Sequence, residues 1–170
     1  MNRRNFLTSC AAAGMVTALN LSLVERAFGQ TQRTSRKVAS VSPIRRSDEE
    51  WKRLLTPEQY SITRHGGTEV PYSSPLLNIH DRGTFACVDC DLPLFSSKTK
   101  FDSQTGWPSF WAPIAKRNVK QNIDNSLAET RTEVLCARCA AHLGHVFADG
   151  PPPTGLRYCM NGIALKFVKA

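Results

Sequence analysis

The sequence predicts a mainly β domain, built from short antiparallel strands and preceded by short N-terminal helices. Beyond Gly67, short runs of β-forming residues alternate with turns that contain Pro and Gly, which is typical of a compact antiparallel domain. Before Gly67, two capping-box patterns at Ser47 and Thr56 indicate two short helices. Two Cys-x-x-Cys pairs lie inside the β region and add a metal-binding signal.

The N-terminus has the order of parts found in an export signal. A twin arginine at positions 3 and 4 precedes an uncharged stretch over 5–24, and small residues follow over 27–29. We therefore expect a twin-arginine signal peptide over 1–29 that is cleaved on export. The mature protein is expected to be periplasmic, or otherwise exported through the twin-arginine route. After cleavage we expect no stable membrane association. The alternative is a retained anchor, because the uncharged stretch is just long enough to span a membrane.

The rest of the chain divides into a linker and one domain. Residues 30–46 are polar and basic, which predicts a flexible linker and places the folded domain over 47–170. The formal net charge of the 170-residue chain is +8. A basic chain can bind nucleic acid, but no aromatic residues are interleaved with these charges, so we expect no nucleic-acid partner.

Two helices are expected at the start of the domain. The first should begin after Ser47 and end at Leu54 or Leu55. The second should begin after Thr56, with proline at its first helical position, and end near Arg64 before a glycine pair.

The remaining elements are short strands separated by turn residues. Their β-branched and aromatic residues and their flanking turns favour strands of four to six residues. The expected strands are Thr84–Cys87, Leu92–Phe95, Glu133–Cys136, Leu156–Cys159 and Ile163–Val168.

The two Cys-x-x-Cys pairs predict a structural zinc site. The four ligands are Cys87, Cys90, Cys136 and Cys139, with 45 residues between the pairs. This spacing lets both sulfurs of a turn face one ion, and four thiolates complete a closed tetrahedral site without a catalytic role. Two alternatives are redox-active pairs of the thioredoxin type and structural disulfides. The first normally opens a helix in a βαβ unit, which this sequence does not indicate.

Among the cysteines of the expected domain, Cys159 is the one that is not a ligand of this zinc site. It is therefore the candidate nucleophile. His142 and His145 precede it and offer acid–base groups, although a lone histidine is usually structural. Trp107 lies in an aromatic loop broken by Gly and Pro, and the plain interpretation is that such aromatics belong to the core. In a strand, Asn161 would share the face of Cys159.

Taken together, these motifs resemble the peptide-methionine (R)-S-oxide reductase family, MsrB. The resemblance covers about residues 49–168. It is carried by Leu55–Tyr60, Thr105–Phe110, His142–Phe147, Asp149–Cys159 and both Cys-x-x-Cys pairs. It implies a zinc-bearing fold of two antiparallel β-sheets and thiol-dependent reduction of methionine (R)-S-oxide in oxidised protein substrates.

The resemblance also implies roles for single residues. The Cys159 thiolate attacks the sulfoxide sulfur and becomes a sulfenic acid. The indole of Trp107 holds the substrate methyl group, Asp149 orients a histidine, and Arg157 favours the thiolate. The implied catalytic residues are Cys159, His145, His142 and Asn161, and the implied substrate-binding residues are Trp107, Asp149 and Arg157.

Thr105 departs from the family pattern. Many members carry a resolving cysteine two positions before the tryptophan, where this chain has Thr105. Cleavage would also remove Cys10, so we expect an external thiol or a thioredoxin-like partner to reduce Cys159 directly. Gly162, where Ser or Ala is more usual, is expected to matter little. Two rival functions are an exported zinc-ribbon binding module without catalysis and a thiol-disulfide oxidoreductase that uses the Cys-x-x-Cys pairs.

Overall fold

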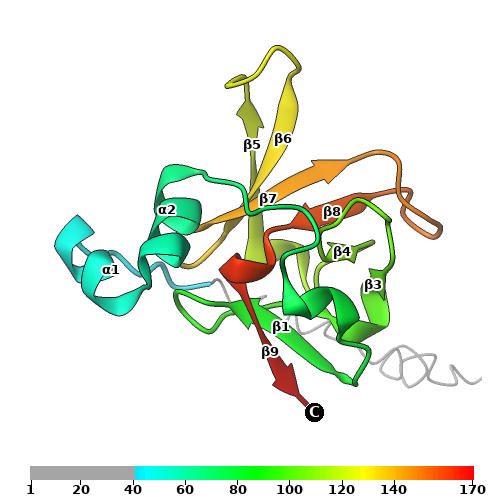
Figure 1. Ribbon diagram of the computed structural model, residues 1–170, viewed down its shortest axis with the longest axis horizontal. Helices are drawn as coiled ribbons and strands as arrows, with labels where there is room; N and C mark the ends of the chain where they lie inside the picture. The colour runs from blue at the N-terminus through cyan, green and yellow to red at the C-terminus, as the bar shows by residue number, and fades with distance from the viewer. Residues whose placement is uncertain (1–40) are drawn as a thin grey trace, which may run out of the picture. The chain divides into compact units, whose positions relative to one another are not determined.

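The computed structural model describes residues 41–170, which form the unit shown in colour in Figure 1. The signal peptide expected over 1–29, and the linker as far as residue 40, lie outside the described residues. Val41 and Ile44 pack against the core, and the Ile44 N–H donates to the Arg138 carbonyl at 2.7 Å. The packed unit therefore begins before the boundary expected at 47. Within residues 41–170, no helix has the length and apolar character needed to cross a membrane.

Both N-terminal helices begin where their capping boxes predict. α1 covers Asp48–Leu54 and α2 covers Pro57–His65. In each, the N-cap hydroxyl accepts from a backbone N–H and the third helical side chain reaches back to the N-cap N–H. α2 ends at Gly66, whose φ of 68° is the left-handed conformation that glycine adopts without strain.

The strands form two antiparallel sheets, as expected for the fold class. The three-stranded sheet has the order β2 (Pro93–Ser96), β1 (Gly83–Cys87) and β9 (Leu165–Lys169). The six-stranded sheet has the order β3 (Lys100–Phe101), β4 (Ser109–Phe110), β8 (Arg157–Met160), β7 (His142–Phe147), β6 (Arg131–Cys136) and β5 (Val119–Asp124). Single 3-10 turns connect several of them: η1 (Pro75–Asn78), η2 (Ser97–Thr99), η3 (Lys116–Asn118) and η4 (Gly162–Ala164).

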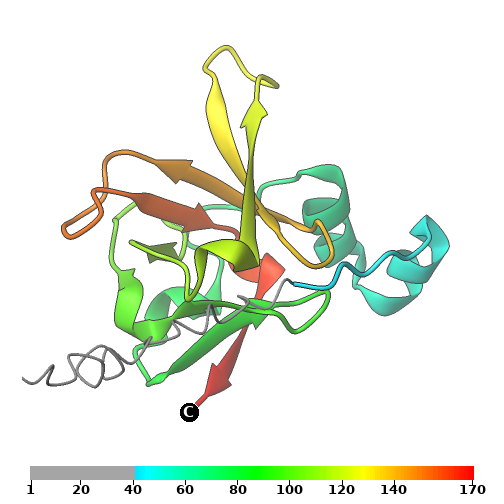
Figure 2. The ribbon, with the colours of Figure 1, turned by 180° about the vertical axis from the view of Figure 1, so that it is seen from behind.

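Four of the five expected strands are confirmed within two residues, and the differences are of two kinds. The stretch expected as one strand over 163–168 divides into η4 and β9. Four strands, β3, β4, β5 and β7, were not expected. β5 is polar and largely exposed, so it lacks the apolar alternation that marks a strand. It pairs with β6 in a hairpin whose tip projects beyond the other strands in both views (Figures 1 and 2).

An aromatic cluster joins the two sheets. The Phe110 ring stacks on Phe95 with centroids 4.5 Å apart and meets the edge of Phe85 at 4.9 Å. All three phenylalanines are fully buried. Tyr158 of β8 packs against Phe95 in the same cluster. Since side chains alternate along a strand, burial of Tyr158 turns the next residue, Cys159, to the opposite face.

Candidate active site and metal centre

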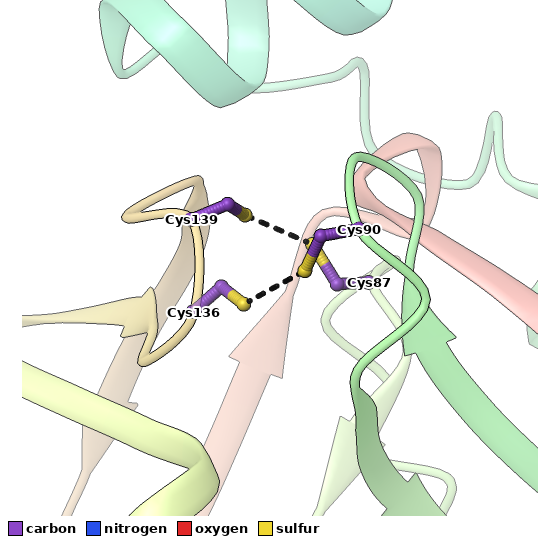
Figure 3. A group of neighbouring side chains, drawn as sticks. All are labelled: Cys87, Cys90, Cys136 and Cys139. Atoms are coloured by element: carbon purple, nitrogen blue, oxygen red, sulfur yellow. Dashed lines mark hydrogen bonds between the residues drawn. The ribbon is translucent and has the colours of Figure 1, made fainter. Parts of the chain in front are cut away.

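Four cysteine side chains converge on one point between the two sheets. Their sulfurs all lie within 4.8 Å of one another. The short contacts join the two Cys-x-x-Cys turns, at 3.6 Å between Cys87 and Cys139 and 3.5 Å between Cys90 and Cys136 (Figure 3). Contacts across the turns suit one shared metal ion, whereas a redox pair would bring the two sulfurs of one turn together.

The two turns have the same backbone geometry. The Asp91 N–H donates to the Cys87 carbonyl at 3.0 Å, and the Ala140 N–H donates to the Cys136 carbonyl at 2.9 Å. Asp91 and Ala140 both have positive φ, at 63° and 59°. Hydrogen bonding to the neighbouring sulfurs, Cys136 foremost, raises the pKa of the Cys87 thiol, so a bound cation is needed to keep all four as thiolates.

An arginine from α2 links both turns. The Arg64 guanidinium donates to the Asp89 carboxylate of the first turn at 3.2 Å and to the Cys139 carbonyl of the second at 3.0 Å. The same guanidinium lies 4.7 Å above the ring of Trp51 in α1. The helices are therefore attached to the metal centre through one side chain.

Cys159 lies in the middle of the six-stranded sheet, on the face away from the core. Its neighbours are Ser109 of β4 on one side and His145 of β7 on the other. Directly opposed residues of antiparallel strands have Cβ atoms about 4.5–5.5 Å apart, so the Cys159 thiol and the His145 imidazole are side by side. Gly144 makes this approach possible, because a Cβ there would lie 2.2 Å from the Cys159 carbonyl oxygen.

A β-bulge brings the two histidines to the same side. In a regular strand, residues three apart face opposite sides. Here Leu135 opposes His142 while Val134 opposes Gly144, so Leu143 is an extra residue on β7. Leu143 is fully buried, and the rings of His142 and His145 lie 5.4 Å apart.

Each histidine is held by a carboxylate that sequence reasoning missed. His145 Nε2 is 2.7 Å from Asp124 of β5, and His142 Nδ1 is 2.7 Å from Glu133 of β6. Hydrogen bonds from Ser126, and also from His145, hold the pKa of Asp124 well below its usual range. An ionised Asp124 accepts a hydrogen bond from the Nε2–H of His145. The Nδ1 atom of His145 is then the one that can exchange a proton with a substrate. Burial lowers the pKa of His145 and Asp124 opposes that shift.

A small pocket of about 100 Å³ gathers four of the expected site residues. Cys159, His145, Trp107 and Asn161 all line it, together with Thr68, Arg131, Gly144 and Phe147. A larger cavity of about 630 Å³ lies beside it, lined by α2 and the segment that follows. The small pocket is the candidate active site, because it contains the free thiol and the acid–base group.

His142, Asp149 and Arg157 do not line this pocket. Asp149 was expected to orient a histidine, but its carboxylate accepts two bonds from the Arg157 guanidinium, at 2.9 and 2.7 Å. That expectation is therefore corrected. The ion pair with Asp149, and then the nearby Cys159, raise the pKa of Arg157, so a fixed positive charge stands close to the thiol.

Thr105 directs its hydroxyl at the candidate nucleophile. Thr105 Oγ1 lies 3.7 Å from Cys159 Sγ and 2.8 Å from the Ser103 hydroxyl, which lies 2.7 Å from the Ser109 hydroxyl. A hydroxyl chain thus ends at the sulfur. The expectation that Gly162 matters little is not supported, because a Cβ there would lie 1.9 Å from Ser74 Oγ.

The two carboxylates that sequence reasoning missed, Glu133 and Asp124, differ in whether the sequence marks them. Glu133 is a charged residue inside an expected strand, which could have marked it as a partner for a site residue. Asp124 lies 21 residues before His145 in an unexpected strand, and nothing local marks it.

Comparisons with known proteins agree on one family. The model of the SelR domain matches residues 55–169. The peptide methionine sulfoxide reductase MsrB of Pseudomonas putida (strain W619) is 56% identical over 119 residues, which cover 70% of this chain and 90% of that protein. MsrB of Hahella chejuensis is 50% identical over 127 residues, covering 75% and 91%. MsrB of Methanosarcina mazei is 52% identical over 126 residues, covering 74% and 90%.

Proposed function

The chain belongs to the SelR-domain family of peptide methionine sulfoxide reductases, MsrB, and is a peptide-methionine (R)-S-oxide reductase; on that premise, we propose that Cys159 is its nucleophile. The observation that carries this proposal is the cross-strand pair of Cys159 and His145 in a pocket lined by Trp107. A thiol needs a neighbouring acid–base group to act on a sulfoxide, and this pair supplies both.

The first half-reaction transfers oxygen to the enzyme. The Cys159 thiolate attacks the sulfoxide sulfur while the oxygen takes up a proton from the His145 imidazolium. This attack forms an S–S bond to the substrate. The hydroxyl group then moves from the substrate sulfur to the Cys159 sulfur, so that the S–O and S–S bonds of the adduct break and methionine leaves with the electron pair of the S–S bond. Cys159 ends as sulfenic acid, so the enzyme is oxidised and the substrate reduced by two electrons. Arg157 favours the thiolate by its charge, and Asn161 assists from the pocket wall.

The R preference has a geometric basis in this proposal. With the substrate methyl group against the Trp107 indole, only one configuration at sulfur directs the oxygen toward His145 and the lone pair away from it. The S epimer would place its oxygen on the apolar indole and lose the proton donor.

The test is turnover of the separated R and S epimers of a peptide methionine sulfoxide by the purified protein with dithiothreitol. We expect turnover of R only, abolished in Cys159→Ser. An active Cys159→Ser variant would refute the nucleophile, and equal turnover of both epimers would refute the role of Trp107.

We propose that the reduction of Cys159 uses an external thiol or a thioredoxin-like protein. Four of the five described cysteines are gathered in the metal centre, and a hydroxyl of Thr105 stands 3.7 Å from the sulfur. Two external thiols would regenerate the Cys159 thiol, releasing water and one disulfide. Dimedone labelling of Cys159 after one turnover supports this cycle, and an intramolecular disulfide in the cleaved protein would overturn it.

We propose that the metal is one structural zinc ion per chain. Thiolate ligands in two knuckles fit zinc, which would hold the two turns together and supply no chemistry to the reaction. Metal analysis of the protein purified without added metal should give about one zinc per chain. Iron at that stoichiometry would contradict the proposal.

We also propose export through the twin-arginine route, which rests on the order of parts in the N-terminal sequence. Replacing both Arg3 and Arg4 by lysine keeps the charge and should retain the protein in the cytoplasm at its full length. Unchanged export of this variant, measured by cell fractionation, would refute the route.

A further inference from the structure

Glu69 lies in the segment between α2 and η1 and contacts two residues of the candidate active site. Its backbone N–H donates to Asn161 Oδ1 at 3.0 Å. Its carbonyl oxygen accepts from the indole Nε1 of Trp107 at 3.2 Å. One residue therefore binds two pocket walls that come from different parts of the chain.

The carboxylate of Glu69 fixes this residue to the start of η4. One oxygen accepts from the Gly162 N–H at 2.6 Å and the other accepts from the Ile163 N–H at 2.9 Å. These are short, charge-assisted bonds to the start of η4, three residues after Cys159. The neighbouring Thr68 and Val70 are both exposed, so they give the segment little hold of their own.

We propose that Glu69 is a positioning residue for the methionine sulfoxide site. Its carboxylate anchors the segment to η4, and its backbone then holds the Trp107 indole and the Asn161 amide at a fixed separation around Cys159. This inference rests on the proposed function. It assigns to Glu69 the task of setting how tightly the substrate methyl group is bound, without contact with the substrate itself.

The geometry requires a carboxylate, since both acceptor oxygens face backbone donors. In Glu69→Gln one of those oxygens becomes an NH₂ group, which would point a donor at a donor. Glu58 offers a matched control. It is exposed, lines the same large cavity as Glu69, and within residues 41–170 makes no hydrogen bond to Trp107 or Asn161.

The experiment compares wild type, Glu69→Gln and Glu58→Gln in the full chain. Active Cys159 is first titrated with iodoacetamide, so that rates are expressed per competent site. We expect KM for an R-sulfoxide peptide to rise about tenfold in Glu69→Gln, with kcat changed less than about twofold, because loosening a binding wall weakens ground and transition states alike. Glu58→Gln should leave both parameters unchanged.

The positions of the indole signals in a ¹H–¹⁵N spectrum give a second readout. A smaller amount of folded protein would weaken these signals but would not change their positions. The chain has three tryptophans, so the other two serve as internal references. In Glu69→Gln we expect the Trp107 indole signal, identified from its loss in Trp107→Phe, to shift while the others stay. An unchanged KM or an unchanged Trp107 signal would overturn the proposal, even if the variant is less stable.

The two proposals fail separately. If wild type turns over neither epimer, the proposed function is wrong and the positioning role is judged by the Trp107 signal alone: a shift in Glu69→Gln supports it and no shift refutes it. If wild type is active, an unchanged KM in Glu69→Gln refutes the positioning role and leaves the function intact.

Discussion

Gly162→Ala is the substitution whose outcome the structure constrains most closely. The added Cβ would lie 1.9 Å from Ser74 Oγ and 2.6 Å from Ser74 Cβ, whereas ordinary contacts begin at 3.4 Å. The hydroxyl can rotate away, but the Ser74 Cβ moves only with its backbone. Ser74 is 6% exposed and caps η1, so the two segments must separate.

The cost follows from that displacement. Forcing one extra carbon into a packed site costs about 1–3 kcal/mol, and loss of unfolded-chain freedom on replacing glycine offsets up to about 1 kcal/mol. We expect Gly162→Ala to lower the free energy of unfolding by about 1–2 kcal/mol. Ser74→Gly removes both clashing atoms and should cost about 1 kcal/mol or less, since glycine is tolerated at an N-cap.

The assay is urea unfolding of the two single variants and the double variant, followed by tryptophan fluorescence. The double variant should be about as stable as Ser74→Gly alone, with a coupling of about 1–2 kcal/mol in its favour. Its kcat/KM should also recover relative to Gly162→Ala, because the Gly162 N–H regains its bond to Glu69. Additive free energies, within about 0.5 kcal/mol, would refute the reasoning.

Three further predictions follow from the site. Thr105→Cys should form a disulfide with Cys159 after one turnover, since the two side-chain atoms are 3.7 Å apart in wild type; thiol counting that finds no such bond would contradict the hydroxyl geometry. Asp124→Asn should lower the pKa of His145 further, because Asp124 raises it. As the pH is increased, the rate of single-turnover methionine formation should therefore begin to fall at a lower pH than it does in wild type. A descending limb at the same pH as in wild type would exclude His145 as the acid. Cys139→Ser should release the metal and lower the free energy of unfolding by several kcal/mol, measured by metal analysis and thermal unfolding, and full metal retention would contradict the four-cysteine centre.

Local sequence patterns predicted several structural features of this protein. The capping boxes at Ser47 and Thr56 act within one helical turn, so α1 and α2 begin where the sequence predicts. The Cys-x-x-Cys spacing fixes two sulfurs on one turn, and this geometry is independent of the distant pair. Cys159 stood out as the candidate nucleophile by motif and by exclusion from that site.

Other features depend on neighbours distant in sequence. β5 has no apolar alternation and becomes a strand because it pairs with β6. The carboxylates of Asp124 and Glu133 reach the histidines only because β5, β6 and β7 are adjacent in the sheet.

The sequence by itself therefore determined the fold class, the cysteine quartet and the candidate nucleophile, because each rests on short-range spacing or on a motif read along the chain. Only the tertiary structure decided how the site is assembled. Burial of Leu143 in a bulge turns His142 and His145 to one side, and two backbone N–H groups after Cys159 recruit Glu69 to hold Trp107 and Asn161. Both arrangements satisfy polar and apolar groups that meet only after the sheets have packed.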